Sequence, residues 1–237
     1  MTPSAPPGSG AGRAARRPRR PGERHERSLA TRTAIVVAAA ERFAVVGYHG
    51  ATLGEIVSLS GVTKGAMYFH FPNKEAVADA VIAATDEVWT ALLTELGTCS
   101  GDPLHNVVVL TEQVVDRVRH DPIVRGGTRL LNDAAVTVRH GAAHYRFAEQ
   151  SVVTRLREAS AAGALRESID VAVLGRQIAT LMAGRHLISE RSDTLDDLPA
   201  RVADMWDTLL PLIATPDWLA QHRSAHASAA RAAGHRR

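Results

Sequence analysis

The chain has 237 residues, of which 45% are hydrophobic and only 4% aromatic, so a core must be built mainly from Ala, Val, Leu and Ile. No apolar run reaches the roughly 18 residues that a membrane-spanning helix needs, which excludes an integral membrane protein and membrane partners. Cys99 is the only cysteine, which excludes an intrachain disulfide and a cysteine-based metal cluster and favours a reducing, cytoplasmic environment.

The two ends of the chain are basic, whereas the middle is acidic. The net charge is +3, yet residues 1–27 carry +5 and residues 221–237 carry +4, which leaves −6 for residues 28–220. The N-terminal segment is rich in Pro, Gly and Arg and has no apolar stretch of the kind that a secretory signal needs. We predict disordered tails at 1–27 and 221–237, which either add salt-sensitive phosphate contacts or only keep the chain soluble.

The first predicted helix opens near residue 28, and Gly47 ends it. Its apolar residues recur at helical spacing: Ile35, Ala39, Phe43 and Val46. Two short helices follow. Thr52 can cap the first of them, Gly61 supplies the left-handed conformation that stops it, and Thr63 caps the second. The second helix carries three residues away from its apolar side: Lys64, Gly65 and Tyr68. This is the layout of a helix-turn-helix, whose second helix lies in the DNA major groove.

The rest of the chain also follows helical patterns. Asn73 can cap a long helix after Pro72, and further helices are predicted at 74–96, 104–119, from 122, 144–162, 170–189 and 195–214. The Gly126-Gly127 pair predicts irregularity in the helix that begins at Pro122. No segment alternates in the manner of a strand. We therefore expect an all-α fold, with a three-helix DNA-binding domain at 28–75 and a helical ligand-binding and dimerisation domain at 76–220.

The motif Thr-Lys-Gly-Ala-Met-Tyr-Phe-His-Phe at 63–71, followed by Asn-Lys-Glu at 73–75, resembles the TetR family's signature around its recognition helix. Further pieces resemble the γ-butyrolactone-receptor branch of that family, at 61–72, 121–130 and 205–214. The resemblance implies a homodimer that represses secondary-metabolite or antibiotic genes from a double-stranded, palindromic DNA operator. It also implies release from that operator by a small-molecule effector, and it implies no catalytic residue and no cofactor.

The start of the recognition helix is where base contacts are expected. Lys64 can donate to guanine O6 and N7, so it is predicted to read a base, although a phosphate contact alone is the alternative. Gly65 lets the helix backbone approach the DNA. Residues at helix starts favour an anion, and others match backbone-clamping residues of the family. On these grounds the predicted phosphate contacts are Thr52, Thr63, Tyr68, His70 and Lys74. The alternative is that the two threonines only cap their helices and that His70 only packs near Phe71.

The resemblance also implies an effector pocket in the C-terminal domain, with predicted contacts from Thr85, Trp89, Val124, Phe147, Ala183 and His186. Receptors of the branch commonly carry a Trp on the helix matching 144–162, a Thr just before the glycine matching Gly184, and a Gln two residues after it. This chain has no Trp on that helix and has Ala183 and His186 instead. The effector is therefore either a γ-butyrolactone-type signal or, for a pseudo-receptor, an antibiotic or pathway intermediate.

The last two predicted helices carry more apolar residues than one protomer's domain needs. In the family such helices form a four-helix bundle between subunits, which implies dimerisation through Leu174, Ile178, Leu181, Met205, Trp206 and Leu209. Two recognition helices about 34–36 Å apart would then match successive major grooves of a palindrome.

Other functions find less support in the sequence. His140 and His144 stand four residues apart, as a helical zinc pair would, but no carboxylate-histidine motif accompanies them and a solvated pair is favoured. Cys99 is interpreted as an incidental thiol. No phosphate loop, nucleophile elbow or metal-ligand set suggests an enzyme. A ligand-free architectural DNA-binding protein is the remaining alternative, and a nucleoid-associated cytoplasmic location is expected.

Overall fold

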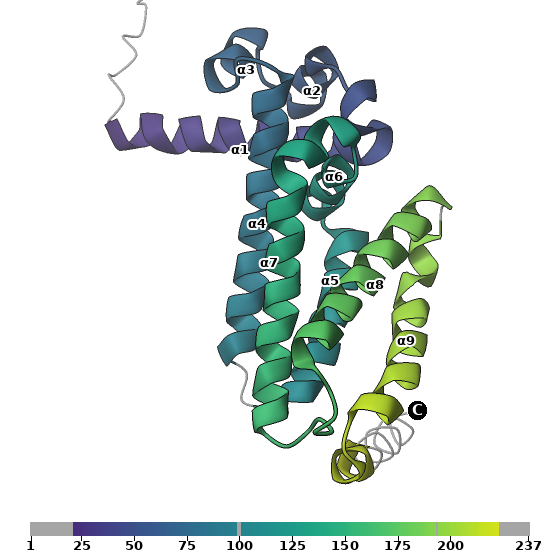
Figure 1. Ribbon diagram of the computed structural model, residues 1–237. Coiled ribbons are helices and arrows are strands. Elements are labelled where there is room, and N and C mark those ends of the chain that lie inside the picture. The colour runs from purple at the N-terminus through teal and green to yellow at the C-terminus, as the bar shows by residue number, and fades with distance from the viewer. Residues whose placement is uncertain (1–20, 99–100, 193, 223–237) are drawn as a thin grey trace, which may run out of the picture.

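The computed structural model describes residues 21–98, 101–192 and 194–222. These residues form helices, with one isolated bridge between Leu165 and Ala214, so the predicted all-α fold is confirmed. A small N-terminal unit lies across one end of a longer helical bundle (Figure 1). No helix in the described ranges is long and apolar enough to cross a membrane. The elements are α1 (Pro21–Gly50), α2 (Leu53–Ser60), α3 (Lys64–His70), α4 (Lys74–Thr98), α5 (Pro103–His120), α6 (Pro122–Leu131), α7 (Ala134–Ala161), α8 (Val171–Arg191), the short 3-10 helix η1 (Leu195–Asp197) and α9 (Leu198–Ile213).

The helix-turn-helix is fixed by local hydrogen bonds. The Thr52 hydroxyl accepts from the Glu55 backbone N–H at 3.3 Å, and the Glu55 carboxylate accepts from the Thr52 N–H at 2.9 Å. The Thr52 hydroxyl also donates to the Glu55 carboxylate at 2.9 Å, and this bond, together with the one from the Thr52 N–H, holds the pKa of Glu55 below its ordinary value. Gly61 adopts φ +66°, and Thr63 accepts from the Ala66 N–H at 3.2 Å. Both predicted caps and the predicted left-handed glycine are confirmed.

The core of the N-terminal unit draws on each of its helices. Its largest members are completely buried and come from α1, α2, α3 and α4 in turn: Phe43, Ile56, Met67 and Val77. Burying side chains of this size contributes about 1.5–3 kcal/mol each, which explains why two helices as short as α2 and α3 are stable here.

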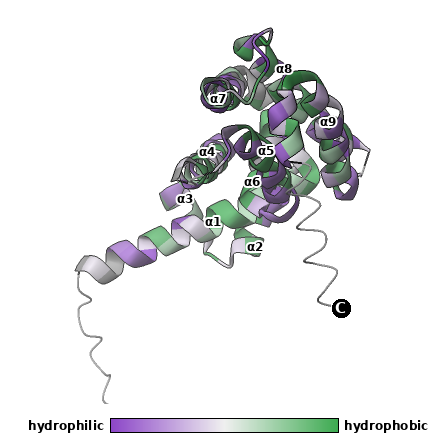
Figure 2. Ribbon diagram, turned by 90° about the horizontal axis from the view of Figure 1, so that it is seen from below, coloured by the Kyte–Doolittle hydropathy of each residue, from purple (hydrophilic) through white to green (hydrophobic). Residues whose placement is uncertain are grey.

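The start of α1 differs from the prediction. Residues 21–27 are helical, not disordered, and in Figures 1 and 2 the N-terminal half of α1 extends away from the rest of the molecule. Pro21 is compatible with a first helical turn, and the charged residues after it favour helices. An exposed charged helix has no apolar periodicity, so the pattern did not show it.

Residues 221–222 are helical too, whereas 1–20 and 223–237 lie outside the described residues. Gly47, at φ +70°, breaks the regular helix as predicted.

Helix α6 is regular, so the prediction that its glycine pair disturbs it was wrong. A Cβ at Gly126 would lie 2.4 Å from the Ala40 carbonyl oxygen of α1, and one at Gly127 would lie 2.0 Å from Thr85 Oγ1 of α4. The two glycines are therefore there to let α6 pack directly on its neighbours. Leu130 of α6 belongs to the N-terminal core, so that core extends beyond the predicted boundary at residue 75.

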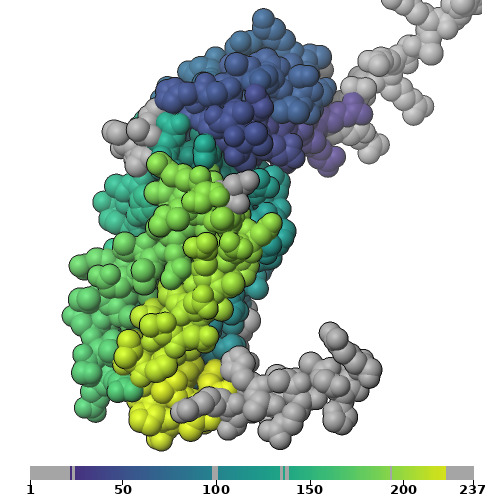
Figure 3. Space-filling model, turned by 90° about the vertical axis from the view of Figure 1, so that its right-hand side faces the viewer, coloured from purple at the N-terminus to yellow at the C-terminus, as the bar shows by residue number. Residues whose placement is uncertain are grey.

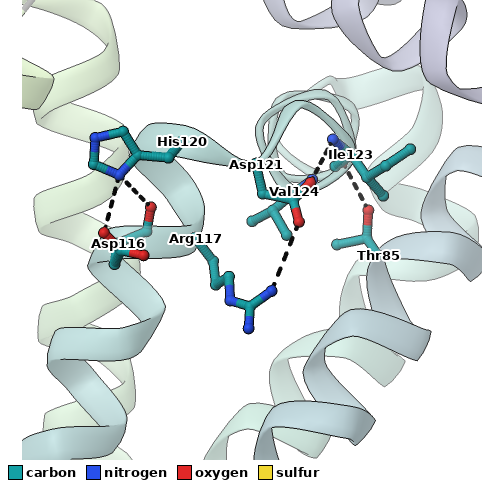
Figure 4. Close-up of polar contacts among 7 residues, drawn as sticks. All are labelled: Thr85, Asp116, Arg117, His120, Asp121, Ile123 and Val124. Atoms are coloured by element: carbon teal, nitrogen blue, oxygen red, sulfur yellow. Dashed lines mark hydrogen bonds and ion pairs between the residues drawn. The ribbon is translucent and has the colours of Figure 1, made fainter.

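The junction between α5 and α6 orients α6 (Figure 4). Asp121 ends α5 and caps α6, since its carboxylate accepts from the backbone N–H groups of Ile123 at 2.8 Å and Val124 at 3.3 Å. The Thr85 hydroxyl of α4 lies 3.0 Å from the Ile123 carbonyl oxygen. Arg117 adds a weak ion pair to Asp121 at 4.0 Å. The first turn of α6 is thus held from both α5 and α4.

Helix α7 begins at Ala134, ten residues before its predicted start, and passes through Gly141 without a break. Side chains near its N-terminus reach acidic residues of α4. His140 Nε2 lies 2.9 Å from Asp79, and His144 Nδ1 lies 3.2 Å from Asp86. The two histidines are therefore not the solvated pair that was favoured. The long-range pairs compensate for the low helix propensity of Gly141.

Candidate nucleic-acid interface and central cavity

The recognition helix presents its predicted residues to solvent. The outer surface of the helix-turn-helix, which we name the DNA-reading face, consists of exposed side chains: Thr52, Thr63, Lys64, Gly65, Tyr68 and Phe69. The caps at Thr52 and Thr63 leave the amides of two helix starts directed outward, where an anion is favoured. Lys64 and Tyr68 stand on the same short helix, and both are exposed.

Phe69 is the residue that sequence reasoning missed. Its side chain is 80% exposed, more than that of any other large hydrophobic residue described, and it stacks edge-on with His70 at 5.1 Å between ring centroids. The helical spacing holds the signal: a residue two positions after a buried one lies on the opposite side of the helix, so Phe69 faces outward once Met67 is assigned to the core. An exposed aromatic ring beside Tyr68 is suited to apolar contact with a thymine methyl group.

Two residues with predicted phosphate contacts, Lys74 and His70, also have partners within the protein. The Lys74 ammonium donates to the carbonyl oxygens of Tyr48 at 2.9 Å and Ala51 at 3.1 Å, which ties the start of α4 to the turn before α2. At most one of its three N–H groups remains for a phosphate. His70 is only partly exposed and lies between the rings of Phe69 and Phe71. The structure thus contains the packing that was the alternative for this histidine, and its phosphate contact stays a prediction.

A cavity of about 500 Å³ lies in the C-terminal bundle, bounded by α4, α5, α6, α7 and α8. Four of the six predicted contacts line it: Trp89, Phe147, Ala183 and His186. The other two predictions were wrong. Thr85 is completely buried between α4 and α6, where its hydroxyl binds backbone carbonyls, and Val124 is completely buried in the hydrophobic core. Both lie on helices that do line the cavity, but each is one helical turn before the nearest lining residue, which is Trp89 on α4 and Thr128 on α6.

The walls of the cavity are mostly apolar and include side chains from several helices, such as Leu92, Leu110, Val118 and Met182. Two buried polar groups are exceptions. Within the described residues, Trp89 Nε1 and both ring nitrogens of His186 have no hydrogen-bond partner. Burial lowers the pKa of His186, against a smaller opposing effect of Glu190, so the ring is neutral near pH 7. Such a cavity is of the size and chemistry that bind a small organic molecule.

A polar network joins the cavity to α6. Glu190, one turn after His186 on α8, pairs with Arg129 of α6 at 3.1 Å and accepts from Asn132 at 3.4 Å. The Tyr145 hydroxyl of α7 donates to Asn132 at 3.2 Å. Burial raises the pKa of Tyr145, so its hydroxyl remains a donor at neutral pH. Asn132 and Tyr145 also line the cavity, so this network extends from the cavity wall to the end of α6.

Known proteins resemble both halves of this structure. Residues 35–81 match "Bacterial regulatory proteins, tetR family", and residues 102–214 match "Tetracyclin repressor-like, C-terminal domain". The A-factor receptor protein of Streptomyces griseus is 34% identical over 195 residues, which are 82% of this chain and 67% of that protein. The chain belongs to the TetR family. It is thus related to transcriptional regulators, and specifically to γ-butyrolactone receptors.

Solved structures of TetR-family proteins extend this relationship. An ArpA-like γ-butyrolactone receptor superposes with a TM-score of 0.72 and 29% identity, over 85% of this chain and 97% of that one. CprB from Streptomyces coelicolor, in complex with its biological operator sequence, superposes with a TM-score of 0.70 and 27% identity over the same shares. The shared arrangement covers the helix-turn-helix and the helical C-terminal domain together.

The predicted dimer contacts of this TetR-family chain fall into two groups. Ile178, Met205 and Trp206 are buried in the protomer's own core, so the prediction that they meet a second subunit was wrong. Trp206 Nε1 donates to the buried Thr111 hydroxyl at 2.7 Å, a long-range bond that the apolar pattern could not show. Leu174 and Leu209 are partly buried, and Leu181 is 38% exposed.

The outer side of α8 and α9 carries a different apolar set. α8 and α9 run next to each other on the side that Figure 3 faces. We name the exposed large hydrophobic residues of these two helices the α8–α9 face: Val173, Leu181, Ile188 and Leu212. On α8 these residues are separated by about two helical turns, so they share one side. The face is adjacent to Leu174 and Leu209, which keeps three of the six predicted residues at or near it.

The remaining candidates do not form a site. His140 and His144 each pair with a different carboxylate of α4, and the described residues contain no group of three potential metal ligands. Cys99 lies outside the described residues.

Proposed function

We propose that the protein is a homodimeric repressor that binds a palindromic operator through the DNA-reading face of each subunit and is released by a small molecule in the cavity. The observation that carries this proposal is a mostly apolar cavity whose wall is connected to the helix-turn-helix through α6. A purely architectural DNA-binding protein would need neither the cavity nor the connection. Its DNA targets would place it at the nucleoid in the cytoplasm.

Helix α6 supports the release step because it belongs to both cores. Val124 packs in the C-terminal core, whereas Leu130 and Leu131 pack in the N-terminal core. Gly126 lies against the α1 backbone, so α6 cannot shift without moving α1 or losing the contact. An effector that binds more tightly to the shifted arrangement would change the spacing of the two recognition helices. Only that difference in affinity is needed for release.

The relatives favour a γ-butyrolactone-type effector that controls secondary-metabolite or antibiotic genes. The A-factor receptor and ArpA-like proteins are named as receptors of this kind. A pseudo-receptor that senses an antibiotic or a pathway intermediate is the second candidate. It is favoured by Ala183 and His186, which line the cavity in place of the Thr and Gln of the branch.

Gel shifts on a selected operator test both halves of this proposal. The operator is first selected from a random duplex library, and the protein is then titrated at fixed salt with and without a γ-butyrolactone. We expect release at saturating lactone. Unchanged operator affinity while equilibrium dialysis shows bound lactone would end the release model.

Sedimentation tests the dimer: Ile188→Glu, on the α8–α9 face, should yield monomers that bind the palindrome weakly.

Lys64→Ala distinguishes base readout from phosphate contact. If Lys64 reads a base, the substitution weakens operator binding by roughly 1–3 kcal/mol and relaxes the preference at one position. An equal loss on scrambled duplex would instead place Lys64 among the phosphate contacts.

A further inference from the structure

Glu190, near the C-terminal end of α8, has a largely buried carboxylate. Its side chain is 12% exposed, it pairs with Arg129 of α6 at 3.1 Å, and it accepts from the Asn132 side chain at 3.4 Å. Breaking such a pair is costly, because the carboxylate that stays behind has no compensating charge. Helices α6 and α8 are therefore held in one mutual position by a contact that is either made or lost.

Arg129 continues this contact into the DNA-binding unit. Its side chain lies against Gly47, where α1 bends, since a Cβ added to this glycine would lie 3.7 Å from Arg129 Nε. Asp133, just after α6, lies 3.7 Å from His49 Nε2. Two carbonyl oxygens of the same segment, which leads from α1 into α2, bind Lys74. The turn before the helix-turn-helix thus rests on the residue that Glu190 holds.

The opposite side of α8 belongs to the α8–α9 face. Ile188 precedes Glu190 by two positions, so its side chain lies on the far side of the helix, and it is 60% exposed. In the proposed homodimer this face meets the second subunit. Glu190 and Arg129 therefore connect the proposed subunit interface with the turn that precedes α2.

We propose, on the basis of the function proposed above, that the Glu190–Arg129 pair sets the distance between the two recognition helices of the dimer. With the pair intact, each DNA-binding unit has a fixed position relative to α8, and so relative to the partner subunit. Without the pair, α6 is free to shift, and the dimer accepts operators of several spacings. Glu190 is thus a positioning residue that belongs neither to the DNA-reading face nor to the cavity wall.

Gel shifts with operators of different spacing test this inference. The duplexes are the selected palindrome and two derivatives, with one base pair added or removed at its centre, which moves the half-sites by about 3.4 Å and rotates one relative to the other. We expect the wild type to bind the selected palindrome at least about tenfold more tightly than either derivative, and Glu190→Ala to reduce this preference to about threefold or less.

A double-mutant cycle assigns the effect to the pair. Arg129→Ala should reduce the spacing preference as Glu190→Ala does, and the double variant should not reduce it further. Asp196→Ala is the control, because it removes an ion pair with Arg119 at 3.0 Å, between α5 and η1, without touching α6. It should retain the full preference. Circular dichroism verifies that each variant is folded, and Glu190→Gln replaces Glu190→Ala if that one is not.

Hydrogen exchange on the DNA-free protein gives a second measurement. In Glu190→Ala, the amides of residues 128–131 and 48–50 should exchange about tenfold faster than in the wild type, whereas those in the middle of α5 should keep their rates. A pair that only stabilises the fold would instead lower the midpoint of urea unfolding and leave the spacing preference unchanged.

Three results would overturn the inference: a spacing preference that survives in Glu190→Ala, unchanged exchange in the two segments, or a wild type that binds all three duplexes equally. Failure of the proposed function is recognised separately. A wild type that binds no palindrome refutes that function, and the exchange rates then still decide whether Glu190 positions the DNA-binding unit.

Discussion

The helix-turn-helix and the cavity differ in how completely their polar groups are paired. In the former, Thr52 and Glu55 pair with each other, Thr63 caps the start of α3, and the Lys74 ammonium binds two carbonyls. In the latter, Trp89 and His186 keep buried nitrogens without partners in the described residues. The first arrangement fixes one geometry, as a surface that must match DNA requires. The second leaves polar groups whose unpaired state costs free energy, and a bound molecule that paired with them would remove that cost.

The largest effect is expected from a substitution that disrupts the contact between α6 and the N-terminal unit. Gly126→Ala puts a Cβ where the Ala40 carbonyl of α1 lies, so we expect a loss of about 3 kcal/mol or more in the free energy of unfolding and loss of operator binding. Urea denaturation measures the first and gel shift the second.

Gly184→Ala is the matched control, because it makes the same chemical change in a helix where no atom lies within 4 Å of the new Cβ. It should stabilise the protein by up to about 1 kcal/mol. Equal effects of the two substitutions would show that α6 does not depend on its contact with α1.

Phe69→Ala changes the DNA-reading face without touching the core. Since the ring is 80% exposed, the free energy of unfolding should stay within about 0.5 kcal/mol of the wild type. Operator affinity should fall about tenfold through the lost base contact. Leu29→Ala, an exposed apolar residue on the projecting part of α1, serves as the control and should leave the affinity nearly unchanged. A drop in stability without a drop in affinity would contradict the assignment.

Trp206→Phe examines one polar contact inside the otherwise apolar C-terminal core. It removes the donor to Thr111 and should cost about 1–2 kcal/mol by denaturant unfolding. The double variant with Thr111→Val should lose less than the sum of the two single changes, because they break the same bond. Additive losses would mean that packing alone makes Trp206 important.

The smallest expected effect concerns pH. Burial lowers the pKa of His186 below its ordinary 6.5, so the unfolded chain takes up the proton first as the pH falls. The contribution of the neutral ring is complete above that value and is lost below it. Between about pH 7.5 and about pH 5.5 the wild type should lose more thermal stability than His186→Gln. Parallel losses in a thermal melt would show that the ring titrates normally.

The sequence predicted what depends on neighbouring residues and failed where distant residues decide. The caps at Thr52 and Thr63 and the glycines at 47 and 61 act within a few positions, and all were predicted. By contrast, Gly126 resembles a helix breaker until the backbone of Ala40 is in view. The exposed start of α1 carries no apolar pattern at all.

The candidate sites divide in the same way. The motif predicted the exposed residues of the DNA-reading face except Phe69, and their contacts with DNA stay predictions. For the cavity, helical spacing identified the correct helices, yet Thr85 and Val124 point into the protein and not into the cavity. Spacing along α8 and α9 also could not tell which apolar residues face the protomer's own core, and so Ile178, Met205 and Trp206 were assigned to the dimer.

The placement of the tryptophans has a practical consequence. The three of them, at 89, 206 and 218, all lie in the C-terminal domain, and Trp89 forms part of the cavity wall. Intrinsic fluorescence excited at the indole band therefore reports on that domain alone, while the DNA-binding unit is silent. Quenching of this emission by an added compound would report occupancy of the cavity, and Phe69→Trp would give the DNA-binding unit a fluorescence signal of its own.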